Sequence, residues 1–307
     1  MKILITGSNG LLGSALVRKC EEQGIDYVAH TREDCDLLNG LDTWFYLAEQ
    51  KENGVDTVVH CAAKVGGVLK NALNHESMFL ENVRINNNVF ESCSTIQIPN
   101  LVNVLSSCLF SAGATYPLTL DQIFTGAPHE TQEGYAYSKR LSYEYVRYYR
   151  KVFGANWFNV IPTNIFGIND NFELDGSHVI PALIRKAEVA KETGGDFVIW
   201  GDGQSLRQFI DSDDLAQIIL NALNNWKEYD TLFAANPKEY QISEIVSYIA
   251  EIFEISKDKI VYDTQKPSGR RRMATISDVP TFPFTPLQMS LVKAVNWYRK
   301  NKDNARK

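Results

Sequence analysis

Tyr135 and Lys139 have the residue types and the spacing to do chemistry together. Residues four positions apart lie on one face of a helix, so the phenol and the ammonium can be neighbours. A nearby ammonium stabilises a phenolate and lowers its pKa from about 10, so the tyrosine could act as an acid or base near neutrality. Ser106 and Ser107 lie about one β-α unit earlier, where a predicted strand ends. A serine there could hold a substrate oxygen that Tyr135 protonates.

The same spacing occurs at Tyr262 and Lys266. No strand-turn-helix pattern of a dinucleotide-binding fold surrounds that second pair, and we assign no chemistry to it. Tyr135 and Lys139 differ because the serines precede them at a strand's carboxyl end. In open α/β sheets, ligands bind at that end.

A glycine-rich turn lies between the first predicted strand, residues 2–6, and a helix that begins near Leu11. Glycines let the backbone turn tightly and approach a pyrophosphate, whose charge then rests on the helix N-terminus. The pattern is Gly-x-x-Gly-x-x-Gly, and it predicts a dinucleotide cofactor, although a purely structural turn also uses glycines. The expected contacts are Gly7, Ser8, Asn9, Gly10, Leu11, Leu12 and Gly13.

The end of the second predicted strand indicates which nicotinamide cofactor binds. An acidic residue there would bond the ribose 2′-hydroxyl of NAD, whereas an arginine accommodates the 2′-phosphate of NADP. This chain has no acid before Glu33 and carries Arg32, which favours NADP(H). A solvated surface arginine is the alternative. Asp36 and Leu37 could line the adenine pocket or belong to an ordinary loop.

Strands alternate with helices through the first half of the chain, which predicts an α/β fold with a doubly wound parallel sheet. Predicted strands cover residues 2–6, 27–30, 56–62, 101–106, 157–162 and 197–200. The first predicted helix begins near residue 11. The others cover residues 41–51, 81–94, 135–152, 179–189, 212–224, 242–253 and 288–301. We expect a dinucleotide-binding domain over residues 1–166 and a smaller α/β substrate-binding subdomain over 167–307, with some later elements returning to the first.

Composition excludes several classes of protein. The chain has 307 residues, 44% of them hydrophobic and 22% charged, and a net charge of −6, which argues against binding to nucleic acid or to an anionic membrane. No apolar run approaches the about 20 residues of a membrane helix, and polar residues interrupt the apolar N-terminus where a signal peptide would be continuous. We therefore expect a cytoplasmic protein.

The cysteines and histidines indicate neither a disulfide framework nor a metal site. The five cysteines are an odd number without a Cys-x-x-Cys pair, which is typical of reduced thiols. Four histidines, namely His30, His60, His75 and His129, lack metal-ligand spacing. His60 and Cys61 fall in a predicted strand and are expected in the core.

Further segments resemble the GDP-L-fucose synthase family of extended short-chain dehydrogenase/reductases. The likeness covers nearly the whole chain and thins after Leu220. The matching segments are the glycine turn, AAKVGG at 62–67, SSC at 106–108, PTNIFG at 162–167, DNF at 170–172, SHVIPALIRK at 177–186 and WGDGQSLRQFI at 200–210. The resemblance implies a Rossmann-type fold and NADPH-dependent conversion of GDP-4-keto-6-deoxy-D-mannose to GDP-L-fucose by C3/C5 epimerisation and C4 reduction.

The resemblance also implies a role for residues that a plain reductase would not need. A ketone at C4 acidifies the hydrogens at C3 and C5, so a base must remove each proton and an acid must return it. Cys108 and His178 match the family positions for those roles, although from sequence alone each is more often structural. Tyr135 would protonate the C4 oxygen, Ser106 would bond it, and Lys139 would hold the nicotinamide ribose.

The family resemblance extends to binding residues. Substrate contacts are expected at Ser107, Asn164, Lys186, Trp200, Arg207 and Arg272. Further cofactor contacts are expected at Ala62, Ala63, Tyr135, Lys139, Pro162, Asn164, Ile165 and His178. The cations suit phosphate charge and Trp200 suits a base or ring, while strand core is the alternative for Trp200.

Several positions depart from the family pattern. Lys186 stands where an arginine is frequent, and the two are not interchangeable at a bidentate phosphate site. Asn9 replaces a basic residue of some members, and Ser111 replaces a proline. Ser268 and Met273 stand where some relatives have Asp and Lys. The nucleotide or the sugar could therefore differ from that of the family.

The sequence leaves three hypotheses about function. The first is the epimerase/reductase named above. The second is a reductase or epimerase for another nucleotide-linked 4-ketosugar, such as a deoxyheptose. The third is a non-catalytic NADP-binding sensor or scaffold, which would not need all five residues of the catalytic set. By resemblance we expect a homodimer formed through helices 81–94 and 135–152.

Overall fold

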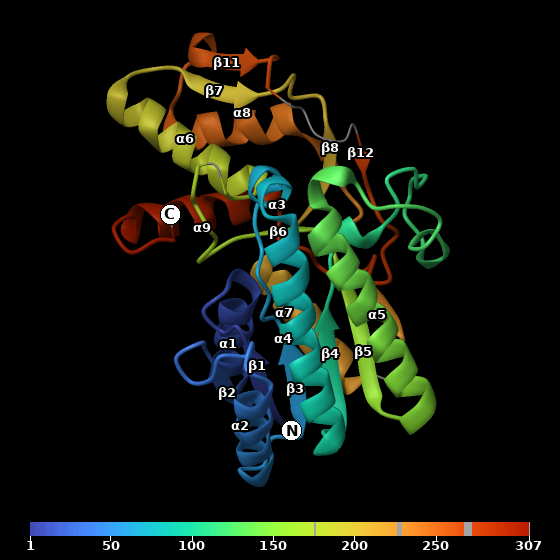
Figure 1. Ribbon diagram of the computed structural model, residues 1–307. Coiled ribbons are helices and arrows are strands. Elements are labelled where there is room, and N and C mark those ends of the chain that lie inside the picture. The colour runs from blue at the N-terminus through green and yellow to red at the C-terminus, as the bar shows by residue number, and fades with distance from the viewer. Residues whose placement is uncertain (175, 226–228, 267–271, 307) are drawn as a thin grey trace.

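A six-stranded parallel sheet forms the first lobe of the molecule in the computed structural model, which describes residues 1–174, 176–225, 229–266 and 272–306 (Figure 1). The strand order is β2-β1-β3-β4-β5-β9. The bounds are β1 Lys2–Thr6, β2 Asp26–His30, β3 Thr57–His60, β4 Asn100–Val104, β5 Asn156–Pro162 and β9 Thr231–Ala234. The order reverses at β1, whose neighbours are β2 and β3, and ligands bind at such a switch point beyond the carboxyl ends of the strands.

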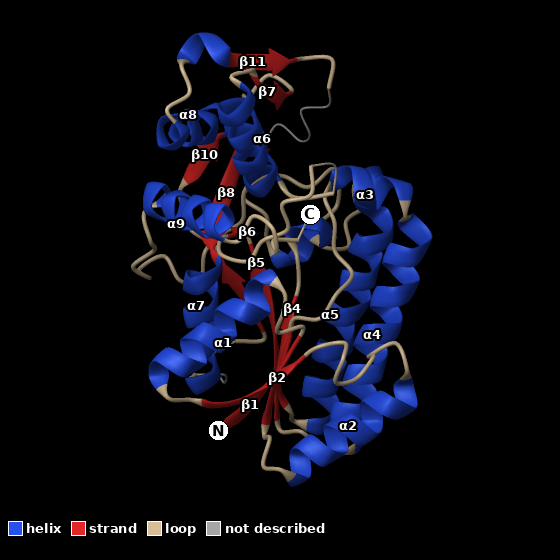
Figure 2. Cartoon of the chain, turned by 90° about the vertical axis from the view of Figure 1, so that its left-hand side faces the viewer, coloured by secondary structure: helices blue, strands red, loops and turns tan. Residues whose placement is uncertain are grey.

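Helices cover both faces of this sheet, as the edge-on view in Figure 2 shows. α1 (Leu11–Gln23) and α7 (Ser212–Asn224) lie on one face, and their apolar side chains share a core with β1, β3, β4 and β5. α2 (Gly40–Glu52), α4 (His75–Thr95) and α5 (Glu133–Phe153) cover the other face. The α/β doubly wound fold predicted from the alternation is confirmed.

The second lobe lies at the carboxyl edge of the sheet, at the top of Figure 1. Its core joins the apolar faces of α6 (Val179–Thr193), α8 (Ile242–Phe253) and α9 (Leu287–Lys300). Short strands complete it: β6 Asn164–Phe166, β7 Phe197–Trp200, β8 Leu206–Asp211, β10 Glu239–Gln241, β11 Ile260–Asp263 and β12 Arg272–Met273. α3 (Val68–Leu73) follows β3 in the first lobe. Because α7 and β9 return to the first sheet, the second lobe is built from separate stretches of chain.

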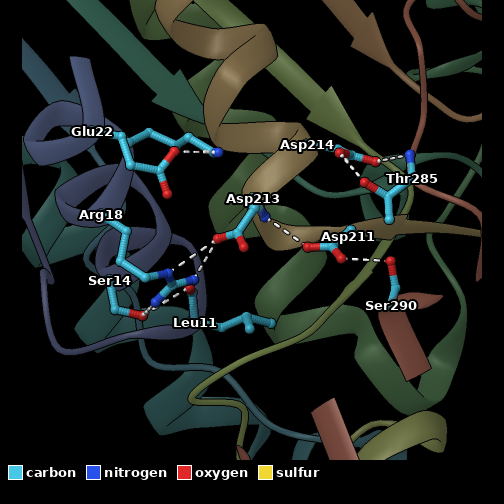
Figure 3. Close-up of polar contacts among 10 residues, drawn as sticks. Leu11, Ser14, Arg18, Glu22, Asp211, Asp213, Asp214, Thr285 and Ser290 are labelled. Carbon is cyan, nitrogen blue, oxygen red and sulfur yellow. Dashed lines mark hydrogen bonds and ion pairs between the residues drawn. The ribbon is translucent and has the colours of Figure 1, made fainter. Parts of the chain in front are cut away.

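Acidic residues at the start of α7 join the two lobes (Figure 3). Asp213 accepts hydrogen bonds from the guanidinium of Arg18 on α1, at 2.6 and 3.2 Å. Asp211, the N-cap of α7, accepts from Ser290 of α9 at 2.5 Å. Asp214 likewise accepts from the backbone and hydroxyl of Thr285. The helix behind the glycine turn is thereby linked through α7 to the second lobe.

The predicted elements mostly form, with corrections at their ends. The strands expected over 56–62 and 101–106 are too long, because the chain leaves the sheet after His60 and Val104 to enter loops at its carboxyl edge. The helix expected over 81–94 begins earlier, at His75. α3, β6, β8, β9, β10, β11 and β12 were not predicted.

Among the described residues, we find no helix with both the length and the apolar character needed to cross a bilayer.

Candidate active site

The turn between β1 and α1 brings backbone close to backbone. Gly7 adopts a φ of +66°, and a Cβ there would lie 2.9 Å from the Cα of Ala62, two residues beyond β3. A Cβ on Gly13 would lie 2.2 Å from the carbonyl oxygen of Gly7. Gly10 caps α1 without a side-chain hydrogen bond, and the first turn of α1 contains no acid. The helix N-terminus therefore has the backbone exposure and the positive end that a pyrophosphate requires.

The end of β2 lies beside this turn. Ser8 donates to the carbonyl oxygen of His30 from its backbone at 3.0 Å and from its hydroxyl at 2.9 Å. Arg32 follows two residues later, with 71% of its side chain exposed and its Nε 3.8 Å from Asp36. Leu37 is buried in the core beneath α2. The guanidinium of Arg32 is therefore exposed near the glycine turn.

A hydrogen-bond chain fixes the start of the loop after β3. The hydroxyl of Thr6 accepts from the backbone N–H groups of Cys61 and Ala62, both at 3.1 Å, and lies 2.9 Å from Nδ1 of His60. Nε2 of His60 lies 3.1 Å from Oδ1 of Asn86. Burial lowers the pKa of His60 to about 3, so the ring is neutral and can bridge the two groups as acceptor and donor. No local sequence pattern predicts this role for Thr6, His60 or Asn86.

Asn82 of α4 holds the next residues of that loop. Its Oδ1 accepts from the backbone N–H of Lys64 at 2.8 Å, and its Nδ2 donates to the carbonyl oxygen of Lys64 at 2.9 Å. Asn82 is buried. The backbone of AAKVGG is thus fixed against α4.

α5 carries Tyr135 and Lys139 to the carboxyl end of β4. Nζ of Lys139 donates to the carbonyl oxygen of Val104 at 2.7 Å and lies 5.7 Å from the centroid of the Tyr135 ring. Burial lowers the pKa of Lys139 to about 8. Burial raises the pKa of Tyr135 well above its ordinary value, and the neighbouring Cys108 adds to that rise. The lowering of the Tyr135 pKa expected from sequence is therefore wrong for this structure, in which desolvation of the phenol dominates.

Polar side chains under α5 fix its position on the sheet. Asn103 and Asn159 are register partners on β4 and β5, and Asn103 donates to Oδ1 of Asn159 at 2.8 Å. Asn103 also donates to the hydroxyl of Ser142 at 3.3 Å, and Asn159 donates to the carbonyl oxygen of Tyr143 at 3.3 Å. All of these side chains are buried. A shift of α5 along its axis would break both contacts just beyond Lys139.

Ser106 and Cys108 lie in the turn that follows β4. Ser106 is half-buried and caps a 3-10 helix, Ser107–Leu109, by accepting from the backbone N–H of Cys108 at 3.3 Å. Cys108 is also half-buried, whereas Ser107 is buried. Of the two serines, Ser106 is the more accessible.

His178 reaches the carboxyl edge of the sheet from the second lobe through a bridging loop, described over residues 167–174 and 176–177. Asn169 donates to the carbonyl oxygen of Asn9 at 3.0 Å, and Gly67 donates to that of Gly176 at 2.8 Å. Nζ of Lys70 on α3 lies 3.5 Å from Oε2 of Glu173. The bridging loop is therefore tied to the glycine turn at one end and to the loop after β3 at the other.

His178 caps α6 immediately after the bridging loop. Its side chain is exposed, yet the surrounding protein lowers its pKa by desolvation. The lowered pKa favours the neutral imidazole, which is the form that accepts a proton.

The residues expected at the nucleotide lie in the second lobe. Lys186 is on α6, Trp200 ends β7, and Nζ of Lys186 lies 4.5 Å from the centroid of the Trp200 ring. Arg207 is on β8, and Asn164 donates to the carbonyl oxygen of Gln208 on that strand at 2.8 Å. The guanidinium of Arg272 is paired with Glu239 at 2.7 and 2.5 Å, so its charge is already compensated. Ser268 lies outside the described residues.

Comparison with known proteins identifies the family. The model of the NAD dependent epimerase/dehydratase family matches residues 3–242. The chain belongs to that family.

Several relatives match the chain over most of its length. GDP-L-fucose synthase of Dictyostelium discoideum is 36% identical, covering 99% of this chain and 97% of its own length. GDP-L-colitose synthase of Yersinia pseudotuberculosis is 34% identical, covering 89% of this chain and 88% of its own. A crystal structure of a GDP-L-fucose synthetase from Naegleria fowleri bound to NADP has a TM-score of 0.89 at 31% identity, covering 100% of this chain and 95% of that one.

The structure of this epimerase/dehydratase family member brings most of the expected site residues to one edge. Within the described ranges, no group of three metal-ligating side chains is present. Leu12, Leu37 and Pro162 are buried, and so only their backbone or one face of the side chain could border a cofactor. The expected cofactor contacts at Ala62, Ala63, Asn164 and Ile165 are half-buried beside the same edge.

The bridging loop contains a buried carboxyl group. Oδ1 of Asp170 accepts from the backbone N–H of Asn171 at 2.7 Å, and Oδ2 has no hydrogen-bond partner among the described residues. Burial raises the pKa of Asp170 to about 7, and Arg306 opposes that rise. Arg306 also donates to the carbonyl oxygen of Asn169, which fixes the C-terminal end of the chain to the bridging loop.

Asp170→Asn should flatten the dependence of stability on pH. The folded-state pKa of about 7 exceeds the unfolded value of about 3.8, so the native state binds the proton more tightly and loses stability as pH rises through that interval. Urea unfolding at pH 5 and pH 8 measures the difference. Wild type should lose more stability between these pH values than Asp170→Asn does, while exposed Asp196→Asn should behave as wild type. Equal losses of stability in wild type and Asp170→Asn between pH 5 and pH 8 would contradict a raised pKa for Asp170.

Proposed function

We propose that this chain is a bifunctional NADPH-dependent enzyme that converts GDP-4-keto-6-deoxy-D-mannose to GDP-L-fucose. The observation that carries the proposal is the meeting of two sets of groups at one edge. Ser106, Cys108 and Tyr135 lie there on the first lobe, and the bridging loop brings His178 from the second. A reductase needs only the serine, tyrosine and lysine, whereas epimerisation also needs groups that move protons at carbon.

The glycine turn and the end of β2 fit NADP(H). The start of α1, which has no side-chain cap, suits the pyrophosphate, and exposed Arg32 suits the 2′-phosphate. When bound, the cofactor supplies the hydride for C4. The solved relative bound to NADP supports this choice.

Tyr135 is suited to donate a proton at the C4 oxygen. Its raised pKa keeps the phenol protonated before reaction, and the ammonium of Lys139 lies close enough to stabilise the phenolate that remains. The hydroxyl of Ser106 can donate a hydrogen bond to the same oxygen. The bond from Lys139 to Val104 and the buried Asn103–Asn159 pair hold these groups in position.

Cys108 and His178 are suited to move protons at C3 and C5. The C4 ketone makes each adjacent hydrogen acidic, so a base can remove it and an acid on the other face can return a proton with inversion. Neutral His178 can accept a proton and the thiol of Cys108 can donate one. The two groups come from different lobes, so a sugar can lie between them.

The length of α6 suits a sugar nucleotide. Lys186 lies just over two turns beyond His178, about 12 Å along the helix axis. With the hexose at His178, that separation would suit a diphosphate bound by Lys186, with Trp200 beside it.

A second function is a reductase for another GDP-linked 4-ketosugar. The 34% identity to a GDP-L-colitose synthase supports this second candidate function. The departures at Lys186 and Met273 fall in the segments expected to contact the substrate.

The two functions are separated by NADPH consumption with GDP-4-keto-6-deoxy-D-mannose, followed by product stereochemistry from NMR. Consumption with inversion at C3 and C5 supports the epimerase/reductase. Consumption without inversion would make the chain a simple 4-reductase, and no consumption with NADPH still bound would point to another sugar.

Cys108→Ser and Tyr135→Phe should separate the two half-reactions. Cys108→Ser should slow epimerisation about a hundredfold or more, because it removes a general acid-base group, while leaving the Kd of NADPH unchanged. Tyr135→Phe should slow reduction by a similar factor and retain exchange of the C3 and C5 protons. Proton exchange by NMR and NADPH consumption measure the two steps. Wild-type rate and stereochemistry in Cys108→Ser would remove this residue from the mechanism.

Arg32→Ala should reduce selectivity for NADPH. Loss of charge-assisted bonds to the 2′-phosphate should raise the Kd of NADPH about ten- to a hundredfold and leave that of NADH within about twofold. Fluorescence titration of both cofactors measures this. Glu33 is the adjacent exposed residue of opposite charge, so Glu33→Ala is the control and should not weaken the binding of NADPH. If Arg32→Ala kept the wild-type preference for NADPH over NADH, Arg32 would not be the residue that binds the 2′-phosphate.

We further propose that α4 and α5 pair with a second copy of the chain. α5 exposes an apolar series along its outer side, with Leu141 52%, Tyr148 61% and Val152 66% exposed. Near the start of the two helices, Phe79, Tyr137 and Leu141 line an apolar hollow of about 460 Å³. An exposed apolar area of this kind is typical of an interface.

Leu141→Glu should shift the chain towards the monomer. Light scattering of wild type should give twice the chain mass of 34.7 kDa. The variant should give a lower mass, because it would bury an unpaired carboxylate in the interface. Leu41→Glu on α2, which is 66% exposed, is the control and should keep the wild-type value. A monomeric wild type would contradict the proposal.

A further inference from the structure

A buried guanidinium joins α5 to the turn that follows β4. Arg140 comes directly after Lys139 on α5, and only 6% of its surface is exposed. Its Nε donates to the carbonyl oxygen of Leu109 at 2.7 Å, and its Nη2 donates to that of Gly126 at 2.8 Å. Backbone oxygens accept both of these hydrogen bonds, so one side chain connects three segments of the first lobe.

The first of these oxygens is the last carbonyl of the 3-10 helix that carries Cys108. Ser106 caps the start of this helix, where its hydroxyl accepts from the backbone N–H of Cys108 at 3.3 Å. The carbonyl groups at the C-terminal end of a helix have no partner within the helix, and Arg140 supplies one to Leu109. Side chains thus fix both ends of this short helix, and one of them comes from α5.

The second oxygen belongs to the returning end of a loop over residues 110–126. Ala112 donates from its backbone to the carbonyl oxygen of Ala127 at 2.8 Å, so the two ends of the loop lie side by side. The guanidinium carbon of Arg140 lies 5.6 Å from the centroid of the Phe124 ring in this loop and 5.4 Å from that of Tyr137 on α5. A planar guanidinium can lie over rings while it donates to two fixed oxygens, which suits an ammonium less well. These contacts therefore favour an arginine over a lysine.

We propose that Arg140 is a positioning residue that holds the turn of Ser106 and Cys108 against Tyr135. Tyr135 and Arg140 belong to the same helix, five residues apart, so the bond to Leu109 fixes the distance between the phenol and the turn. The thiol of Cys108 is near enough to the phenol to contribute to its raised pKa. Arg140 acts through the turn and not on the substrate, and this role rests on the proposed function for the reaction that the turn performs.

Steady-state kinetics of Arg140→Gln with GDP-4-keto-6-deoxy-D-mannose test the proposal in the full chain. The variant should lower kcat for NADPH consumption about tenfold, because the turn loses its position, while KM for the sugar and the Kd of NADPH stay within about twofold. Arg140→Lys keeps the charge but cannot donate to both carbonyl oxygens in the same way, so it should lower kcat only about threefold. Arg150→Gln is the matched control, because Arg150 lies on the same helix and also donates to a backbone carbonyl oxygen, that of Trp157 at 3.3 Å. It should keep the wild-type kcat.

Alkylation of Cys108 by iodoacetamide reports the position of the turn without any turnover. Cys108 is half-buried, so its reaction in the native chain depends on how the turn is held. Arg140→Gln should raise the alkylation rate about tenfold, because the released turn opens more often, and mass spectrometry of the peptide that contains Cys108 measures this rate. Arg150→Gln should react at Cys108 as wild type does.

The two measurements separate this proposal from the proposed function. A wild-type kcat and a wild-type alkylation rate in Arg140→Gln would overturn the role of Arg140, as would an equal loss of kcat in Arg150→Gln. If wild type consumes no NADPH with this sugar, the proposed function is wrong and the alkylation rates alone decide whether Arg140 holds the turn. If Arg140→Gln does not fold, Arg140→Lys takes its place, and wild-type values of kcat and alkylation in that variant would overturn the proposal.

Discussion

The attachment of the bridging loop to the first lobe is the constraint on which the rest of the site depends. Asn169 bonds the backbone of Asn9 in the glycine turn, and Gly176 bonds that of Gly67 beyond β3. Each hydrogen bond contributes about 1 kcal/mol, so together they favour one placement of the loop. That placement puts His178 at the same edge as the groups on the first lobe. Under the proposed function, the cofactor and the sugar would therefore share one site.

Desolvation favours the neutral forms of Tyr135, His60 and His178, whereas Lys139, with a pKa of about 8, remains mostly protonated at pH 7. Desolvation lowers the pKa of Lys139, His60 and His178 and raises that of Tyr135. A neutral imidazole can accept a proton and a protonated phenol can give one, so the ground state already has both capacities. The same desolvation strengthens the electrostatic effect of any charge that develops during reaction.

Regular elements could be predicted from sequence because their patterns are local. The predicted bounds of β1, β7, α7 and α8 agree with the structure, and Tyr135 with Lys139 follows from helical spacing. β10 and β12, with three and two residues, are too short for any periodicity. The contact of Asn169 with Asn9 joins residues 160 positions apart, and no local pattern encodes it. The hold of Arg140 on the turn after β4 belongs to the same class, since the two residues that it joins lie 31 positions apart.

The central claim is that one edge of the sheet both epimerises and reduces a 4-ketosugar. Reaction of the wild-type chain with GDP-4-keto-6-deoxy-D-mannose and NADPH in D₂O, with the product read by NMR, tests it most directly. Proton transfer through Cys108 and His178 predicts deuterium at C3 and at C5 of an inverted product, and hydrogen from the cofactor at C4. A reduced product without solvent deuterium at C3 and C5 would contradict the account.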